Sequence, residues 1–219
     1  TVDNCSTSLS YTQNSGTVFP VGTTTVTVTS TDAAGLTDVC AFDVIVTDNE
    51  DPIAICQNVT INLNAAGTGS TTAAAVNNGS TDNCTIASLS LSQTAFTCAN
   101  VGTNNVILTV NDINGNSSTC PAVVTVIDAI APNAICQNVT VNLDASGNGS
   151  TTAAAVNNIS TDACGIASLS LSQTAFSCAN VGPNTVTLTV TDVNSNSSTC
   201  TATVNVVDLV PPTAICQNI

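Results

Sequence analysis

The acidic side chains of this sequence gather in a way that could bind a divalent cation. Asp48, Glu50 and Asp51 stand within the six residues TDNEDP, and the sequence contains no Lys, Arg or His to neutralise them. Carboxylate oxygens are ligands that Ca²⁺ prefers, and a site takes about six to eight oxygens. A bound cation would also relieve repulsion in a chain whose formal net charge is −14. Calcium binding is therefore the first chemistry that the residues indicate.

The lack of basic residues excludes several classes of function. General acid and base catalysis needs a titratable group poised near neutral pH, and a serine nucleophile needs a base. Without His, Lys or Arg, and with Glu50 and Tyr11 as its single Glu and Tyr, the sequence predicts no enzyme. It cannot neutralise phosphates, so nucleic acids and anionic membrane surfaces are excluded as electrostatic partners. No apolar stretch is long enough to insert across a bilayer.

The eleven cysteines indicate disulfides and a location outside the cell. They recur at fixed spacings without a neighbouring His or a C-x-x-C pair, so they resemble neither zinc ligands nor a redox motif. Disulfides persist outside the cytosol. They also suit small units with few aromatic residues, here four Phe and one Tyr in the whole chain, because such units bury little apolar surface. We therefore expect a secreted or cell-surface protein.

The sequence is a tandem array with a period of 80 residues. The stretch TDNEDPIAICQN at 47–58 returns as IDAIAPNAICQN at 127–138 and as VDLVPPTAICQN at 207–218. Residues 52–131 align with residues 132–211 without a gap, and the match is too long to arise from shared composition. The predicted domains are repeat 1 (1–51, the C-terminal part of a repeat), repeat 2 (52–131), repeat 3 (132–211) and the start of a further repeat (212–219).

Repeat 1 matches only the second part of a complete repeat. It aligns with residues 80–131 when one residue is dropped, and it lacks counterparts of the first two strands. Because the sequence also stops a few residues into a repeat, we expect it to be a window of a longer secreted chain. The alternative is a true start at Thr1, which would leave an unpaired edge for a neighbouring subunit to complete by strand addition.

The apolar residues of a repeat alternate with a period of two, which predicts β-strands. Val, Ile and Thr, which favour strands, dominate these runs, and Asn, Asp and Gly separate them. The stretch TTAAAVNN at 71–78 is predicted as a strand, with a helix as its alternative. The clearest strands are expected at 58–64, 87–92, 105–110 and 122–127. Short antiparallel strands at this spacing predict an all-β fold, a tandem array of small immunoglobulin-like β-sandwiches.

Residues 3–48 resemble the hyalin repeat (HYR), an extracellular immunoglobulin-like module. The resemblance rests on DNC at 3–5, SGTVFPVGTTTVTVTSTDAAG at 15–35 and CAFDVIVTD at 40–48. It implies a cohesive or structural role and no catalysis. Repeats 2 and 3 depart from the pattern, because FTCANVG or FSCANVG replaces TVFPVG and adds a cysteine to each repeat.

The loops of repeat 2 are expected to meet the acidic linker. In an up-and-down sandwich, the loop at Asp82 and the turn at Asp112 lie at the end where the linker arrives. They would converge there with Asp48, Glu50 and Asp51 on one calcium site. At the second joint the corresponding acids are Asp128, Asp162 and Asp192, and that site should be weaker or absent. The alternative is a solvated acidic linker made rigid by Pro52, Pro132 and Pro212.

The cysteines are expected to form two sets of bonds. The first set joins Cys5 with Cys40, Cys84 with Cys120, and Cys164 with Cys200. The second set has two alternatives. Within repeats, Cys56 would join Cys98 and Cys136 would join Cys178. Across the joints, Cys98 would join Cys136 and Cys178 would join Cys216, with Cys56 bonded to an upstream cysteine. We favour the bonds across the joints, because Cys56 and Cys98 are expected at opposite ends of the sandwich.

The predicted function is that of a structural segment of an extracellular filament or rod. Its partners would be further repeats of the same chain or identical subunits. The alternative is the stalk or binding module of an adhesin that recognises carbohydrate or another cell. Glycans could be attached at Asn-x-Ser/Thr sequences, whose number does not exceed chance. The candidate acceptors are Asn58, Asn78, Asn116, Asn138, Asn148, Asn158 and Asn196.

Overall fold

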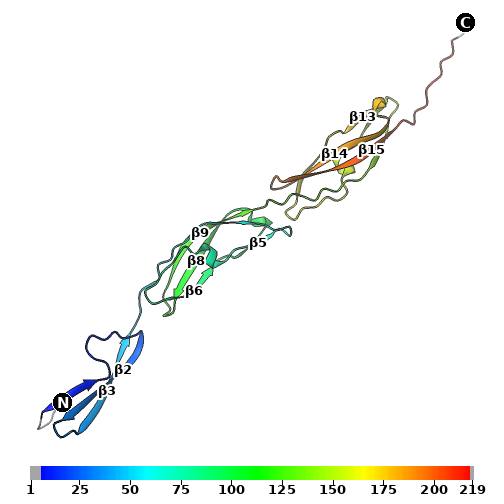
Figure 1. The fold of residues 1–219 in the computed structure, drawn as a ribbon. Coiled ribbons are helices and arrows are strands. Elements are labelled where there is room, and N and C mark those ends of the chain that lie inside the picture. The colour runs from blue at the N-terminus through cyan, green and yellow to red at the C-terminus, as the bar shows by residue number, and fades with distance from the viewer. Residues whose placement is uncertain (1–5, 218–219) are drawn as a thin grey trace. The chain divides into compact units, whose positions relative to one another are not determined.

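The computed structural model describes residues 6–217 and confirms the all-β class (Figure 1). Repeat 1 contributes three antiparallel strands in the order β1-β2-β3. Their bounds are β1 (Thr7–Tyr11), β2 (Gly22–Asp32) and β3 (Thr37–Val46). Residues 6–51 form no second sheet, so this repeat presents a single layer.

Repeat 2 contains two sheets that enclose a core. A four-stranded sheet has the order β4-β9-β8-β6, and a two-stranded sheet pairs β5 with β7. Two short helical turns, α1 and η1, follow β5 and β7. The bounds are β4 (Val59–Asn62), β5 (Thr68–Ser70), α1 (Ala73–Val76), β6 (Ile86–Leu91), β7 (Ala95–Thr97), η1 (Cys98–Asn100), β8 (Gly102–Asp112) and β9 (Ser117–Ile127).

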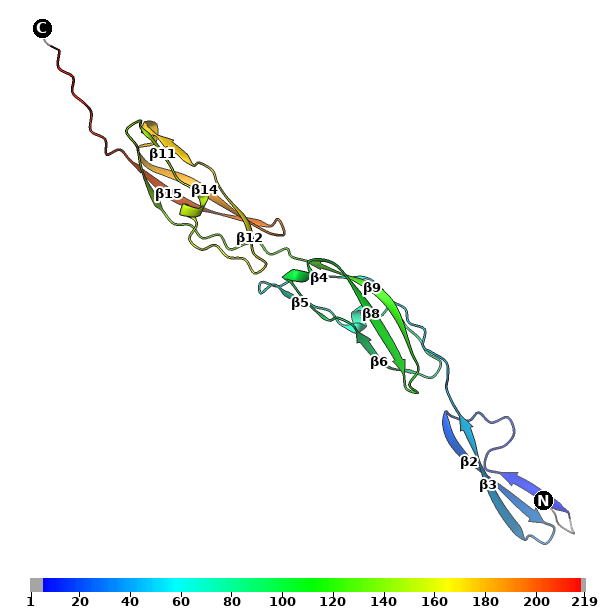
Figure 2. The ribbon, with the colours of Figure 1, turned by 180° about the vertical axis from the view of Figure 1, so that it is seen from behind.

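Repeat 3 has the same elements in the same order. Figure 2 labels four of its strands, β11, β12, β14 and β15, from behind. The four-stranded sheet is β10-β15-β14-β12, and β11 pairs with β13. The bounds are β10 (Val139–Asn142), β11 (Asn148–Ser150), α2 (Ala153–Val156), β12 (Ile166–Leu171), β13 (Ala175–Ser177), η2 (Cys178–Asn180), β14 (Gly182–Asp192) and β15 (Ser197–Val207).

The first strand of each complete repeat runs parallel to the last strand. β4 pairs with β9 from Val59 opposite Val124, and β10 pairs with β15 in the same way. The expectation of purely antiparallel, up-and-down strands was therefore wrong. The segment before β4 first bridges to the stretch after α1, at Cys56 opposite Asn77, and then continues alongside β9. This path places residues 54–58, which we call the AICQN segment, beside the middle of the last strand, and residues 134–138 are its counterpart in repeat 3.

The stretch predicted as a strand at 71–78 contains the helical turn α1. Thr72 caps the turn, because its side chain accepts a hydrogen bond from the amide of Ala75. The alanines that follow have the highest helix propensity of any residue. Val76 is fully buried and anchors the turn to the core.

The cores are built from aliphatic side chains at alternate strand positions. In β14, Val186, Leu188 and Val190 are fully buried, while the residues between them face outward. Phe176 is the one aromatic residue of the repeat 3 core and lies on the smaller sheet. The alternation predicted from the sequence thus sets which face of each long strand is buried.

Candidate functional site at the repeat junctions

Three carboxylates from separate segments meet at the first junction. Asp48 follows β3, Asp82 lies in the loop before β6, and Asp112 ends β8. One side-chain oxygen of each lies within 4.8 Å of the others. All three belong to the same compact unit, which comprises residues up to 54 together with 79–89 and 109–119. This acidic cluster is the candidate site.

Asp112 is the most strongly held member of the acidic cluster. It is only 4% exposed. Its Oδ1 accepts hydrogen bonds from the amides of Asn114, Gly115 and Asn116 at 2.9, 2.7 and 2.8 Å, and its Oδ2 accepts one from the Asn116 side chain at 2.8 Å. Burial raises the pKa of Asp112, but these hydrogen bonds outweigh it and leave the pKa below its ordinary value. The group is therefore ionised at neutral pH.

Asp48 is tied to the same turn of repeat 2. Its Oδ2 accepts a hydrogen bond from the Asn114 side chain at 2.8 Å, and its carbonyl accepts one from the Asn116 side chain at 3.3 Å. The thiol of Cys84 donates to its carboxylate. That bond, with the Glu50 amide, lowers the pKa of Asp48, and it raises the pKa of Cys84.

Asp82 supplies the one oxygen of the acidic cluster that is buried without a partner. Its Oδ2 accepts hydrogen bonds from the amides of Cys84 and Thr85 at 2.7 and 2.9 Å. Its Oδ1 is buried and accepts none. A buried carboxylate oxygen without a partner costs free energy unless a cation or water satisfies it. The donor set, hard oxygens from three carboxyl groups, fits Ca²⁺.

The other two predicted ligands lie outside the acidic cluster. Glu50 accepts a hydrogen bond from the Asn83 side chain at 2.6 Å, and Asp51 is exposed. The structure thus brings together three of the five predicted residues. It adds two asparagines that the sequence did not assign to the calcium site, Asn114 and Asn116. Their signal in the sequence is the Asp-x-Asn-x-Asn pattern at 112–116, which returns at 192–196.

The second junction repeats this geometry with fewer free ligands. Asp128 is 7% exposed; its Oδ1 accepts from the amide of Ile130 and its buried Oδ2 accepts nothing. It lies within 4.8 Å of Asp162 and of the sulfur of Cys164. That sulfur is in a disulfide and cannot act as a thiolate ligand. Asp192 is held by the amide and side chain of Asn196 and is not part of this group.

Three disulfides connect the described residues, and their pairing corrects both predicted sets. Cys56 bonds Cys120 and Cys136 bonds Cys200, each over 64 residues, because the parallel first strand brings the AICQN segment level with the last strand. Cys98 bonds Cys164 over 66 residues and so joins repeat 2 to repeat 3.

The predicted pairs of Cys84 with Cys120 and of Cys164 with Cys200 were therefore wrong. Cys84 lies at the end of the sheet, whereas Cys120 lies inside β9. The bonds of Cys98 with Cys136 and of Cys178 with Cys216 were also wrong, as was the alternative within repeats. Cys98 does reach the next repeat, but in the loop that holds Asp162. Cys40, Cys84, Cys178 and Cys216 are unpaired, and Cys5 lies outside the described residues.

A glycine makes room for the bond between repeats. Gly67 has φ +71°, and a Cβ built on it would lie 2.7 Å from the sulfur of Cys98. Any larger residue would therefore push against the disulfide. Gly147 stands in the same relation to Cys178.

The candidate glycosylation sites differ in how their amides are used. The side-chain nitrogens of Asn116 and Asn196 donate to the buried aspartates of the junctions, so a glycan there would break those bonds. The other acceptors are exposed: Asn58, Asn78, Asn138, Asn148 and Asn158.

The carboxylates of the acidic cluster should make stability depend on acid. The pKa values of Asp48 and Asp112 are lower in the folded chain than the ordinary 3.8. Groups of this kind contribute stability that is complete above 3.8 and is lost as the pH falls through the folded pKa. Urea unfolding followed by circular dichroism should therefore show constant stability from pH 7 to 5 and a decline below 3.8.

Asp112→Asn should remove part of that decline, whereas Asp38→Asn, on the exposed start of β3, should leave it unchanged. Equal pH profiles for the two variants would contradict the role assigned to Asp112.

Comparisons with known proteins find one family model and a set of solved structures that match the chain. No helix among the described residues has the length and apolar character needed to cross a membrane. The family model HYR domain matches residues 1–46. A comparison with curated proteins found no match.

The solved structures that match the chain include protocadherin extracellular domains. The match to protocadherin gamma B7 extracellular cadherin domains 1–4 has 13% sequence identity and a TM-score of 0.37. It covers 85% of this chain and 58% of the protocadherin chain. The match to mouse clustered protocadherin PcdhgC3 EC1-3 has 14% sequence identity and a TM-score of 0.34, and it covers 87% of this chain and 78% of the protocadherin chain. The two sheets of repeats 2 and 3 make each of them an immunoglobulin-like β-sandwich, and residues 1–46 match the HYR domain family.

Proposed function

We propose that the chain is a structural segment of an extracellular filament or rod, in which calcium and disulfides hold successive repeats together. The observation that carries the calcium part is the buried, unpartnered Oδ1 of Asp82, which lies among the ionised carboxylates of Asp48 and Asp112. The disulfide from Cys98 to Cys164 supports the second part. The chain contains two complete repeats of one design and part of a third, and arrays of such repeats extend in one dimension.

A cation at the acidic cluster would act on the junction itself. Asp48 belongs to the linker, and Asp82 and Asp112 belong to the loops of repeat 2. An ion shared by all three would couple linker and loops and would offset the mutual repulsion of the carboxylates. At the second junction, where the disulfide replaces one ligand, binding should be weaker.

Calorimetric titration of the full chain with Ca²⁺ tests this proposal. We expect binding that EDTA reverses, that Asp82→Ala abolishes at the tighter site, and that Asp51→Ala leaves unchanged because Asp51 is exposed and outside the acidic cluster. Asp128→Ala should affect only the weaker site. Absence of heat with Ca²⁺, together with an unchanged melting temperature in EDTA, would overturn the calcium part of the proposal.

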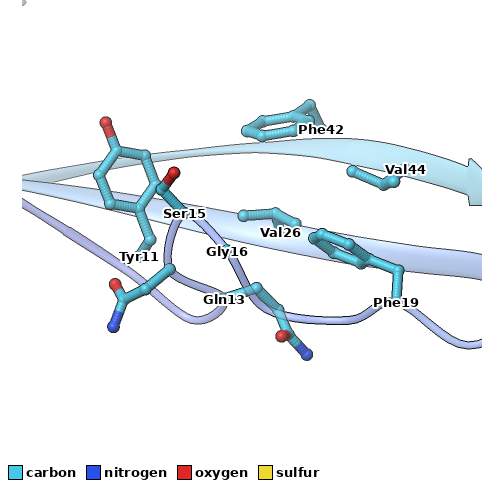
Figure 3. Close-up of a pocket in the computed structure, with 9 residues that line it drawn as sticks. Tyr11, Gln13, Ser15, Gly16, Phe19, Val26, Phe42 and Val44 are labelled. Atoms are coloured by element: carbon cyan, nitrogen blue, oxygen red, sulfur yellow. The ribbon is translucent and has the colours of Figure 1, made fainter.

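A second candidate function is an adhesin stalk or module that recognises carbohydrate. Three of the five aromatic residues of the chain, Tyr11, Phe19 and Phe42, line one pocket of repeat 1 (Figure 3), and aromatic faces pack well against sugars. Electron microscopy of the native material separates the two functions. Long uniform fibres would support the filament, and short stalks that end in a distinct head would support the adhesin.

A further inference from the structure

The linker aspartate of the second junction lacks two hydrogen-bond donors that its counterpart has. Asp128 follows β9 as Asp48 follows β3, 80 residues earlier. The carboxylate of Asp48 accepts from the side chain of Asn114 and from the thiol of Cys84. No donor among the described residues reaches the Oδ2 of Asp128, although this residue is only 7% exposed. A buried carboxylate oxygen in this state costs free energy unless a cation or a water satisfies it.

The first missing donor is a thiol that a disulfide has consumed. Cys164 stands where Cys84 stands in repeat 2, and its amide donates to the loop residue Asp162 at 2.7 Å, as the Cys84 amide does to its own loop aspartate. The sulfur of Cys164 lies within 4.8 Å of an oxygen of Asp128 and of one of Asp162. Because this sulfur is bonded to Cys98, it has no proton to donate. The disulfide therefore leaves the neighbouring carboxylate open to another partner.

The second missing donor is an amide whose oxygen is buried in its place. Asn194 stands where Asn114 stands in the turn after β8, and its amide donates to the aspartate of its own turn at the same distance, 2.9 Å. The turn meets the linker as at the first junction, because the side chain of Asn196 donates to the carbonyl of Asp128 at 3.2 Å. The Asn194 side chain therefore faces the linker aspartate. Its Oδ1 is buried and accepts no hydrogen bond from any described residue. Two acceptors that face each other repel unless a cation or a water lies between them.

We propose that the second junction binds Ca²⁺ through side-chain oxygens of Asp128, Asp162 and Asn194, and that closing the disulfide between the repeats strengthens this site. Carboxylate and amide oxygens are both ligands that Ca²⁺ takes. Two carboxylates and one amide carry less charge than the three carboxylates of the acidic cluster, so the site is the weaker of the two.

The disulfide acts on the site by removing a hydrogen-bond donor. When the bond closes, the thiols of Cys98 and Cys164 give up two protons and two electrons to a disulfide oxidant such as oxidised glutathione, which leaves as two thiols. When it opens, the thiol of Cys164 can donate to Asp128 as Cys84 donates to Asp48 at the first junction. A donor on that oxygen competes with a cation. Reduction should therefore weaken cation binding at the second junction.

This inference rests on the proposed function, because it gives one of its two cation sites a ligand set and a means of control. It does not need the acidic cluster, since every measurement is made in a chain that carries Asp82→Ala. If Asp82→Ala left calcium binding as it is in the unchanged chain, the site at the acidic cluster would fail while the second junction could still be measured. The two failures are therefore distinguishable.

Replacing Asn194 in the Asp82→Ala chain tests the amide ligand. In a calorimetric titration with Ca²⁺, Asn194→Ala should weaken the remaining site about tenfold, the loss typical of one contact to a charged group. Asn194→Asp should tighten it, because a carboxylate replaces the amide. The matched control is Asn158→Ala, an exposed asparagine of the same repeat, which should leave the affinity unchanged. Circular dichroism of each variant confirms that it is folded.

Two cysteine variants in the same chain test the control by the disulfide. Cys98→Ala leaves the thiol of Cys164 unbonded, and Cys98→Ala combined with Cys164→Ala removes the thiol together with the bond. The first variant should bind Ca²⁺ about three- to tenfold more weakly, because the thiol now donates to Asp128. The second should regain the affinity of the parent chain. Alkylation followed by intact mass confirms that Cys164 has formed no other disulfide.

Three results would overturn the proposal. The folded Asp82→Ala chain could show no binding of Ca²⁺, or Asn194→Ala could bind as tightly as Asn158→Ala. The two cysteine variants could also have equal affinities, which would show that the thiol proton has no influence on the site.

Discussion

Replacing Cys56 and Cys120 together with serine should lower the free energy of unfolding of repeat 2 by about 4 kcal/mol. The disulfide closes a loop of 64 residues. Opening such a loop raises the entropy of the unfolded chain, which stabilises the unfolded state by about 4 kcal/mol. The two cysteines also connect the first part of the repeat to the last strand, which are far apart in the sequence. Urea unfolding followed by far-ultraviolet circular dichroism is the suitable measurement, because the chain has no Trp to report by fluorescence.

Cys40→Ser is the matched control for this prediction. Cys40 has the same place in the last strand of repeat 1 as Cys120 has in repeat 2, but it is unpaired. Its replacement should change the free energy of unfolding by less than about 0.5 kcal/mol. A loss of similar size in both variants would show that the cysteines contribute through packing and not through the bond.

Phe96→Ala should destabilise repeat 2 by about 3–5 kcal/mol, the cost typical of deleting a buried aromatic ring. Phe96 is 1% exposed and lies on β7, the strand of the smaller sheet that closes the core. The neighbouring core residues are aliphatic. The three-residue strand β7 has little freedom to move into the cavity that the missing ring would leave. Hydrogen exchange of the β8 and β9 amides should report the loss within repeat 2 itself.

Phe42→Ala provides the comparison, since Phe42 is half exposed on β3 of repeat 1. Its removal should cost less than Phe96→Ala and should leave exchange in β8 and β9 unchanged. If β8 and β9 exchanged no faster in Phe96→Ala than in Phe42→Ala, the assignment of Phe96 to the core would be wrong.

The strands and their buried faces could be predicted from alternation alone. Val106, Leu108 and Val110 are fully buried, as their spacing in β8 requires. The direction of β4 could not, because alternation is the same in a parallel and an antiparallel strand. The pairing of Cys56 with Cys120 followed from that direction. For the same reason, the sequence alone could not choose among the possible disulfide pairings.

The acidic cluster could be predicted in part. Asp82 and Asp112 were expected at the end that meets the linker, because each ends or precedes a strand whose range was evident, and the structure has both within 4.8 Å of Asp48. Glu50 and Asp51 were expected there from their position in the linker. The linker turns at Asp48, whose Oδ1 accepts a hydrogen bond from the amide of Glu50, and the Glu50 carboxylate then reaches Asn83, while Asp51 is exposed. A local turn of this kind leaves no signal in the count of acidic residues.

The three disulfides also decide what happens to the chain when its backbone is cut. Their loops run from Cys56 to Cys120, from Cys98 to Cys164 and from Cys136 to Cys200, and each overlaps the next. Every peptide bond between Cys56 and Cys200 is therefore spanned by at least one of them. A single nick by a protease anywhere in that stretch leaves both pieces covalently joined, so continuity survives damage that would sever an array of repeats linked by peptide bonds alone.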